Sequence, residues 1–423
     1  MKPDPHAAAV RANGKRQRRA LSHVGGEVSV VGNREIGARL AHALDVAPPS
    51  TTGPDEADRD HVHGFHAYPA RLHPTTAARL VAALATERAT VLDPFCGSGT
   101  MLIEAMLAGR RAVGTDLNPL AVRLTRLKTA RRDPRELEAM VSSAKAVVAF
   151  ADERRARRAG ATHRFPREDV ALFDPHVLLE LDSIRAGILE ETREAPVVRE
   201  TLELVLSSIL IKVSRQAADS STAQVKKRIM PGFPARIFES KAEELARRLA
   251  EFAAKLPEEA PAPVVALDDA VRLKTVPASS VDIVITSPPY AATHDYVAHH
   301  AARMRWLGLD GRAFEAHEIG SRRRYAELDA AGVRDEWSRE LARMLKALAR
   351  ACRPGGKIAL VIGDSAVHGE ALRADEIVAA VAPAGALTVV SRASQRRPHF
   401  HAPSAPAFER TPRCEHVIVL SKG

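Results

Sequence analysis

Short apolar runs alternate with amphipathic segments along the part of the chain that begins near residue 91. The runs 91–93 and 112–115 each end beside an aspartate, and the segments that follow them, 100–108 and 120–129, have apolar residues at helical spacing. This alternation of strand and helix predicts a parallel sheet covered by helices. Five further apolar runs bring the predicted strands to seven, at residues 264–267, 282–286, 357–362, 386–390 and 416–420.

A long helical block interrupts this alternation. Residues 131–256 are almost entirely helical in pattern, with a polar, basic segment at 214–228. Because predicted strands lie on both sides of the block, we expect it to be an insertion into one sheet, or a lid on it. The predicted organisation has four parts: a basic, largely irregular leader with one helix near 36–44 (1–60), the first part of the sheet domain (61–130), the helical insertion (131–260) and the second part of the sheet domain (261–423).

Composition and charge add constraints to this picture. The 423 residues include 62 Lys and Arg against 52 Asp and Glu, and the resulting net charge of +10 favours a polyanionic partner. Cys96, Cys352 and Cys414 have no spacing typical of a disulfide framework or a cysteine zinc site, which fits a reducing compartment. The chain has no apolar stretch of about 18 residues and no signal peptide at its polar, arginine-rich N-terminus, so we expect a soluble cytoplasmic protein without membrane association.

The strongest local signal is the sequence Asp-Pro-Phe-Cys-Gly-Ser-Gly-Thr at residues 93–100, between a predicted strand and a predicted helix. Gly97 and Gly99 allow a tight turn and a close approach to a ligand, which the helix N-terminus then faces. Asp116, at the end of the next strand, can accept both hydroxyls of a ribose. The glycine spacing fits neither a dinucleotide fingerprint nor a P-loop, and Asp93 suits a cationic ligand better than a pyrophosphate. The pattern therefore favours a nucleoside that carries an amino acid.

A second signal, Thr-Ser-Pro-Pro-Tyr at residues 286–290, follows another predicted strand directly. Its two prolines fix the backbone and lack N–H groups, which leaves carbonyl acceptors in set directions. The Ser287 hydroxyl and the Pro288 carbonyl can accept hydrogens from a planar amino group, and Tyr290 can stack on a flat ring. A base that has been extruded from a nucleic acid and carries an exocyclic amine meets these demands.

Together the two motifs resemble those of the S-adenosylmethionine-dependent amino-methyltransferases of nucleic acids. Residues 93–100 resemble the family's cofactor loop, and residues 287–290 resemble its catalytic tetrad with serine in the first position. Residues 66–71 resemble the segment that closes over the methionine end of the cofactor, and the Asp-Asp pair after the strand 264–267 resembles an adenine-side contact, which we assign to Asp269. The resemblance implies an α/β fold, a Rossmann-like seven-stranded class I methyltransferase sheet with a helical insertion, and a role in target recognition for that insertion.

The resemblance also implies which residues form the site. The cofactor S-adenosyl-L-methionine would be bound by Tyr68, Asp93, Phe95, Cys96, Gly97, Gly99, Asp116 and Asp269, and catalysis would depend on Ser287, Pro288, Pro289 and Tyr290. Catalysis would consist mainly of alignment of the amine with the cofactor methyl, so no cysteine nucleophile is needed and Cys96 is interpreted as a packing residue.

Within this family, Ser-Pro-Pro-Tyr resembles the cytosine-N4 enzymes, whereas Asn or Asp before the prolines goes with adenine-N6. The resemblance thus implies methylation of DNA, with cytosine N4 favoured over adenine N6, and a restriction endonuclease as a possible partner. The tRNA guanine-N2 methyltransferases have a similar cofactor loop, but usually have Asp before the prolines and an N-terminal RNA-binding module. A catalytically silent nucleic-acid-binding subunit is a further alternative, against which the intact glycines and tetrad count.

Histidines and basic clusters outside the motifs have simpler interpretations. The spacing of His61, His63, His66 and His73 fits no helical or hairpin pair of metal ligands, so we expect no metal site. The basic clusters 226–228 and 322–324 are interpreted as solvated faces, of which at least one contacts phosphate if the substrate is a nucleic acid.

Overall fold

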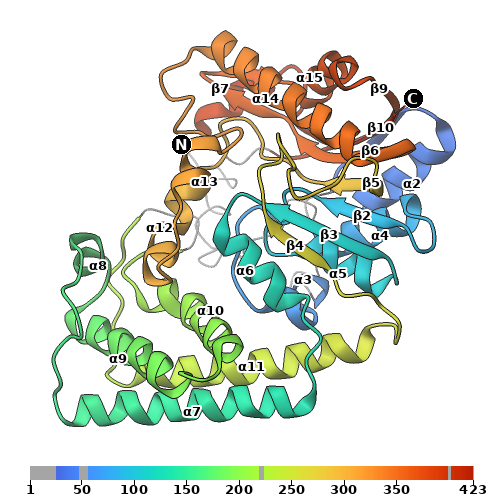
Figure 1. The fold of residues 1–423 in the computed structure, drawn as a ribbon. Helices are drawn as coiled ribbons and strands as arrows, with labels where there is room; N and C mark the ends of the chain where they lie inside the picture. Colours follow the sequence, from blue (N-terminus) through green and yellow to red (C-terminus); the bar gives the residue numbers. More distant parts are fainter. Residues whose placement is uncertain (1–24, 47–55, 219–222, 399–401, 423) are drawn as a thin grey trace, which may run out of the picture.

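The fold is built on a central sheet (Figure 1). The structure, a computed structural model, describes residues 25–46, 56–218, 223–398 and 402–422. The basic arm at residues 1–24 lies outside the described residues. The sheet has the strand order β1-β9-β10-β6-β5-β2-β3-β4. Its strands are β1 (Val28–Gly32), β2 (Thr90–Asp93), β3 (Arg111–Asp116), β4 (Val264–Leu267), β5 (Val281–Thr286), β6 (Cys352–Gly363), β9 (Leu387–Arg396) and β10 (Cys414–Lys422).

Most neighbouring strands of this sheet run parallel. Strands β4, β3, β2, β5 and β6 pair in parallel, whereas β10 lies antiparallel between β6 and β9. All seven predicted strands lie in this one sheet, so the expected α/β class, with a largely parallel, Rossmann-like sheet, is confirmed.

The eighth strand, β1, was not predicted from the sequence. It pairs with β9 at the edge of the sheet, and the side chains of Val30 and Val31 are exposed there. Because β1 has no clear alternation of buried and exposed positions, its pairing with a strand more than 350 residues away is what makes it a strand. The helix expected near 36–44 is present as α2 (Arg34–Leu44) and packs beside β1 and β9.

Side chains of alternate residues along β2 enter two different cores, as the pleat of a strand requires. Val91 belongs to a core shared with helices on one face, whereas Leu92 belongs to a second core that includes Trp337 of α14. Three helices lie near β2 and β3: α4 (Pro74–Leu84), α5 (Thr100–Leu107) and α6 (Pro119–Lys128). Two others lie near β6 and β10: α14 (Ala330–Ala351) and α15 (Ala374–Val381). Short elements complete this part of the chain: α3 (Glu56–Arg59), η2 (His61–Gly64), β7 (Ser365–Val367), β8 (Glu370–Leu372), η3 (Ala382–Gly385) and η4 (Ala402–Phe408).

The helical block between β3 and β4 forms a layer of its own, apart from the sheet (Figure 1). Its helices are α7 (Pro134–Ala156), α8 (Arg167–Leu172), α9 (Pro175–Glu191), α10 (Pro196–Val213) and α11 (Phe233–Lys255). Helix α7 begins with a capping box between Asp133 and Glu136, and proline occupies the first turn of α7, α9, α10 and α11, where its missing N–H costs nothing.

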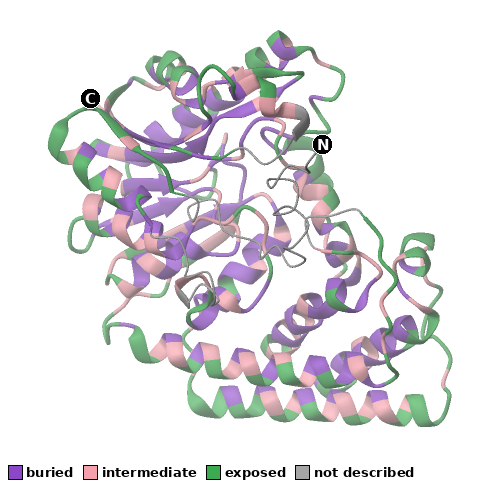
Figure 2. Cartoon of the chain, turned by 180° about the vertical axis from the view of Figure 1, so that it is seen from behind, coloured by how far each residue is buried: buried purple, intermediate pink, exposed green. Residues whose placement is uncertain are grey.

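The helices of this block bury the sides that face one another and expose their outer sides (Figure 2). Helix α10 contacts α6 and also α12 (Tyr296–Trp306), and α11 packs against η2, so the block is connected to the rest of the chain at these three places. In the part of the chain that the structure describes, no helix is long and apolar enough to cross a membrane.

Candidate active site

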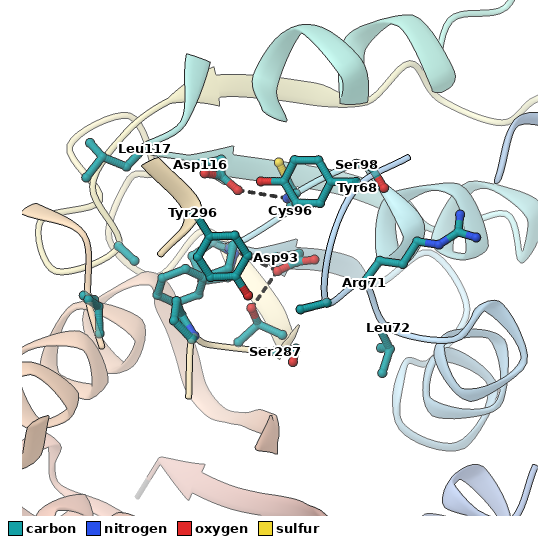
Figure 3. A pocket seen from close by; sticks show the side chains of 18 of the residues that line it. Tyr68, Arg71, Leu72, Asp93, Cys96, Ser98, Asp116, Leu117, Ser287 and Tyr296 are labelled. Atoms are coloured by element: carbon teal, nitrogen blue, oxygen red, sulfur yellow. Dashed lines mark hydrogen bonds between the residues drawn. The ribbon is translucent and has the colours of Figure 1, made fainter. Parts of the chain in front are cut away.

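A cavity lies where the loops after β2, β3, β4 and β5 meet, at the carboxyl ends of these parallel strands (Figure 3). Ligands of open α/β sheets bind at this end because the loops there diverge above the sheet. Two further segments, 68–72 and 296–319, close the cavity on other sides. The lining residues are Tyr68, Pro69, Ala70, Arg71, Leu72, Asp93, Pro94, Phe95, Cys96, Gly97, Ser98, Thr100, Met101, Asp116, Leu117, Asp269, Ala270, Thr286, Ser287, Pro289, Tyr296, Phe314, His317, Glu318 and Ile319.

The glycines of the 93–100 loop are required by the backbone. Gly97 has φ +51° and Gly99 has φ +89°, both in the left-handed region that favours glycine. A Cβ atom on Gly97 would lie 3.2 Å from Cε1 of Tyr68, and a Cβ atom on Gly99 would lie 3.2 Å from Thr125 side-chain atoms. The loop therefore lies close beneath the Tyr68 ring, and Gly99 leads directly into α5.

Asp116 is fixed at the end of β3 by two backbone groups. Its Oδ2 atom accepts from the Gly97 N–H at 2.9 Å and its Oδ1 atom accepts from the Asn118 N–H at 2.8 Å. Burial raises the pKa of Asp116 to about 6, although both hydrogen bonds favour the ionised form. A ligand that donates hydrogen bonds to this carboxylate, such as a ribose, would offset the cost of burying it.

Asp93 connects the two sequence motifs. Its Oδ1 atom accepts from the Thr286 hydroxyl at 2.6 Å and from the Phe95 N–H at 3.1 Å (Figure 3). Burial raises the pKa of Asp93 to about 7, while these two hydrogen bonds act in the opposite direction. The hydrogen bond from Thr286 joins the ends of β2 and β5, which are 193 residues apart in the sequence.

Two neighbouring aspartates after β4 have different environments. Asp268 accepts hydrogen bonds from the backbone N–H and the hydroxyl of Thr275, at 2.6 and 2.7 Å, and does not line the cavity. Asp269 lines the cavity, and its Oδ1 atom accepts from the Val271 N–H at 3.0 Å. Asp269 is thus the member of the pair that a bound ligand can contact.

The four residues of the predicted catalytic tetrad do not all face the cavity. Ser287 and Pro289 line the cavity, whereas Pro288 and Tyr290 do not. The Tyr290 ring is buried against Gly363, and its hydroxyl donates to Oε1 of Glu415 on β10 at 2.9 Å. In this arrangement the Tyr290 ring is unavailable for stacking in the cavity.

Tyr68 is held above the 93–100 loop by two contacts. Its ring stacks on His300 of α12, with 4.9 Å between the ring centroids, and its hydroxyl accepts from Nδ2 of Asn118 at 3.3 Å. Burial raises the pKa of the Tyr68 hydroxyl well above its usual value. Figure 3 shows Tyr68 and Asp116 close to each other at one side of the cavity.

Sequence reasoning missed the lining residues that follow the tetrad. Tyr296, Phe314, Glu318 and Ile319 come from α12, α13 (Arg312–His317) and the residues after it. The Tyr296 N–H donates to Oε1 of Glu318 at 2.8 Å, which ties the start of α12 to the segment after α13. No local sequence pattern distinguishes these residues. An aromatic residue at the start of a helix, such as Tyr296, is as common in a hydrophobic core as in a ligand site.

Four histidines that precede the cofactor loop are buried: His61, His63, His66 and His73. His61, His63 and Glu104 place their ligand atoms within 4.8 Å of one another, a grouping that the sequence spacing did not suggest. Nε2 of His63 lies 2.7 Å from Oε1 of Glu104, and burial lowers the pKa of His63 and raises that of Glu104 to about 8. These shifts favour a neutral hydrogen-bonded pair. Arg71, Arg248 and Lys128 donate to backbone carbonyls of the same turn.

Comparisons with known proteins agree with the first of the two motifs. Residues 44–126 match the family model described as DNA methylase. The chain is 36% identical over 83 residues to the type II methyltransferase M.MvaI of Kocuria varians, covering 19% of this chain and 18% of that protein. It is 30% identical over 78 residues to the type II methyltransferase M.MjaII of Methanocaldococcus jannaschii, covering 18% of this chain and 15% of that protein. The chain thus spans less than a fifth of the length of the curated relatives that it matches.

Comparison with solved structures gives matches of low identity and low TM-score. TrmN from Thermus thermophilus has a TM-score of 0.32 and 11% identity, over 83% of this chain and 49% of that one. The rRNA methyltransferase aviRa from Streptomyces viridochromogenes has a TM-score of 0.34 and 14% identity, over 90% of this chain and 95% of that one.

The resemblance to the DNA amino-methyltransferases is therefore confirmed for the segment 44–126, which includes the cofactor loop. The Thr-Ser-Pro-Pro-Tyr segment lies outside that match. The family match supports S-adenosylmethionine as the cofactor, and the cavity fits it. Three lining aspartates, Asp93, Asp116 and Asp269, suit a cationic ligand with ribose hydroxyls, and the two glycines leave room for it to approach the backbone.

Proposed function

We propose that the protein is an S-adenosylmethionine-dependent methyltransferase that methylates an exocyclic amino group of a base in DNA, with cytosine N4 as the favoured acceptor. One observation carries this proposal. Ser287 and Pro289 of the second motif line the same cavity as Asp93 and Asp116 of the cofactor side, and the Thr286–Asp93 hydrogen bond fixes their relative position.

The bound cofactor supplies an electrophilic methyl group, so the chain's own residues mainly align the acceptor amine. Ser287 and the Pro288 carbonyl accept hydrogens from that amine, which turns its lone pair out of conjugation with the ring. These two acceptors also stabilise the positive charge that develops on the nitrogen. Proline at positions 288 and 289 keeps the backbone rigid, so little reorganisation is needed during the reaction.

Cys96 has a packing role in this proposal. Burial raises the pKa of its thiol well above the usual value, so the thiol remains protonated and is a poor nucleophile. Its Cβ atom lies 3.1 Å from the position that a Cβ atom on Gly114 would occupy, a close contact between the loop and β3.

The acceptor base has to leave a duplex in order to enter a cavity at this depth. Tyr296, Phe314 and Ile319 offer apolar surface on which a flat base can pack. The aromatic contact that the sequence suggested for Tyr290 is thus available from Tyr296 and Phe314.

Replacement of Ser287 by alanine tests the proposed chemistry. We expect the rate of methyl transfer by Ser287→Ala to fall about 100-fold or more, because one of the two amine acceptors is lost. Cofactor affinity, measured by calorimetry, should change little, because the aspartates and the glycine loop remain. Full activity in this variant would contradict the proposed role of Ser287.

The base and the polymer are identified in one measurement. DNA and RNA incubated with the protein and labelled cofactor are digested to nucleosides, and the modified nucleoside is identified by mass spectrometry. N4-methyl-2′-deoxycytidine supports the proposal. N6-methyl-2′-deoxyadenosine would instead identify adenine in DNA as the acceptor, and a methylated ribonucleoside would identify RNA as the substrate. Failure to bind S-adenosylmethionine would instead support a silent nucleic-acid-binding subunit. A restriction endonuclease partner would be sought by co-purification, since the curated relatives are named type II methyltransferases.

A further inference from the structure

A buried polar cluster lies behind the Thr-Ser-Pro-Pro-Tyr loop and consists of Tyr290, Glu415 and Arg397. The Tyr290 hydroxyl donates to Oε1 of Glu415 at 2.9 Å. The other carboxylate oxygen, Oε2, accepts from Nε of Arg397 at 3.0 Å and lies 2.8 Å from Nη2 of Arg397. We call these three residues the Glu415 cluster. Its members come from the tetrad loop, from β10 and from the residue after β9.

The cluster has little access to solvent. Tyr290 is 8% exposed, and Glu415 and Arg397 are each 4% exposed. A charge buried to this extent is costly unless it is paired and its hydrogen-bonding capacity is used. Both oxygens of Glu415 are used, one by a phenol and one by a guanidinium, so Glu415 fixes the direction of the Tyr290 side chain.

The backbone of the loop is fixed from a second direction. Pro288 and Pro289 cannot donate backbone hydrogen bonds, so the loop depends on contacts that follow them. The Ala292 N–H donates to the Gly320 carbonyl at 3.0 Å. Gly320 has φ +66°, and a Cβ atom there would lie 3.2 Å from the Tyr290 carbonyl oxygen.

These contacts decide which side of the loop faces the cavity. Ser287 and Pro289 line the cavity, whereas the Tyr290 side chain is held on β10. If the Tyr290 ring left the Glu415 cluster, the loop 287–290 could rotate about its own backbone. The Ser287 hydroxyl would then no longer be held pointing into the cavity.

We propose that Glu415 is a positioning residue for methyl transfer, which acts through Tyr290 to aim Ser287 and the Pro288 carbonyl at the acceptor amine. The inference rests on the proposed function, because it assigns an indirect role in that reaction. Glu415 lies 125 residues after Tyr290 in the sequence and does not line the cavity.

The kinetic test compares three substitutions in the full-length protein. Glu415→Ala should lower kcat about 100-fold, the cost of a misplacement near 1 Å, with cofactor affinity nearly unchanged. Glu415→Gln keeps a carbonyl oxygen for the Tyr290 hydroxyl and should recover most of the lost rate. Glu409→Gln is the matched control, since Glu409 is exposed and close in the sequence, and it should behave like the wild type.

A double-mutant cycle separates positioning from general destabilisation. With Tyr290→Phe, the hydroxyl that Glu415 holds is absent, so Glu415→Ala should lower kcat much less in this background than in the wild type. An equal loss of kcat in both backgrounds would overturn the inference, because Glu415 would then act independently of Tyr290. Unchanged kcat in Glu415→Ala would overturn it as well.

Hydrogen exchange measured by mass spectrometry gives a readout that does not depend on activity. Glu415→Ala and, to a smaller extent, Glu415→Gln should increase exchange in peptides that cover residues 287–293, while Glu409→Gln should not. If exchange in these peptides is unchanged, the positioning role is wrong even if activity falls. If the wild type methylates no nucleic acid, the proposed function fails, and the exchange data alone decide whether Glu415 fixes the loop.

Discussion

At the scale of single residues, the site contains two carboxylates whose ionised form is disfavoured by burial. Burial raises the pKa of Asp93 to about 7 and that of Asp116 to about 6. Both side chains face the cavity, so a cationic ligand there would offset part of the cost of ionising them. An aspartate-lined glycine loop therefore suits a sulfonium cofactor better than it suits a pyrophosphate.

The raised pKa of Asp93 predicts a pH dependence of stability. Asp93 contributes stability that is present in full below its ordinary pKa of 3.8 and is lost as the pH rises through about 7. Between these limits the wild type should lose up to about 1.4 kcal/mol per pH unit relative to Asp93→Asn. Asparagine keeps an oxygen to accept from Thr286 and Phe95, so the comparison isolates the ionisation. Urea denaturation at a series of pH values measures this difference, and parallel curves for the two proteins would contradict it.

Gly97 provides a second prediction at this scale. Alanine at position 97 would have to adopt φ +51° with its Cβ atom 3.2 Å from the Tyr68 ring. We expect Gly97→Ala to lower stability by about 1–3 kcal/mol and to weaken cofactor binding, because Tyr68 and the loop are displaced together. Gly160→Ala is the control, because a Cβ atom at Gly160 would meet no atom within 4 Å and Gly160 does not line the cavity. Thermal unfolding and calorimetry measure the two effects.

At the scale of elements, the ends of β2 and β5 act as one unit. The Thr286 hydroxyl donates to Asp93 at 2.6 Å, and the two side chains are 1% and 6% exposed. A buried hydrogen bond of this kind keeps the loop 286–290 in register with the loop 93–100 across adjacent strands.

Removal of this hydroxyl tests the connection between the two elements. Thr286→Val keeps the shape of the side chain but leaves Asp93 without one of its donors. We expect a loss of about 1–3 kcal/mol in the free energy of unfolding and a fall in kcat. Thr286→Ser retains the hydroxyl and should restore most of both. Equal effects of valine and serine would show that shape, rather than the hydrogen bond, is what matters at this position.

At the scale of the whole molecule, the net charge of +10 predicts electrostatic binding to a nucleic acid. The basic cluster 226–228 divides into two kinds of residue. Lys227 donates to the backbone carbonyls of Ile211 and Gln216, at 2.9 and 2.7 Å, and therefore has a structural role. Lys226 and Arg228 are exposed, so they are better placed to contact phosphate.

Salt-dependent binding distinguishes these two roles. Lys226→Ala and Arg228→Ala should each weaken DNA binding and reduce the slope of log affinity against log salt by about 1. Arg312→Ala is a suitable control, because Arg312 is exposed but paired with Asp310 at 2.6 Å. Unchanged slopes in the first two variants would place the phosphate contacts elsewhere. Fluorescence anisotropy with a short duplex at several salt concentrations is sufficient for the measurement.

The sequence by itself determined the seven strands and the placement of the two motifs at strand ends. The spacing of apolar residues, the spacing of the glycines and the prolines of 286–290 each determine local backbone structure. They can therefore be recognised from residues that are neighbours in the sequence. The same local reasoning also selected Asp116, and the family resemblance selected Asp269; the structure places both on the cavity.

Only the tertiary structure decided which side chains turn toward the cavity and which turn away. Tyr290 leaves the cavity because Glu415 binds its hydroxyl, and Tyr296 and Phe314 enter it because α12 and α13 pack over the strand ends. Strand β1 likewise exists through its pairing with β9. In each case the deciding contact joins segments that are distant in the sequence. A local pattern sets how a backbone folds, but the direction of a side chain depends on what packs against it.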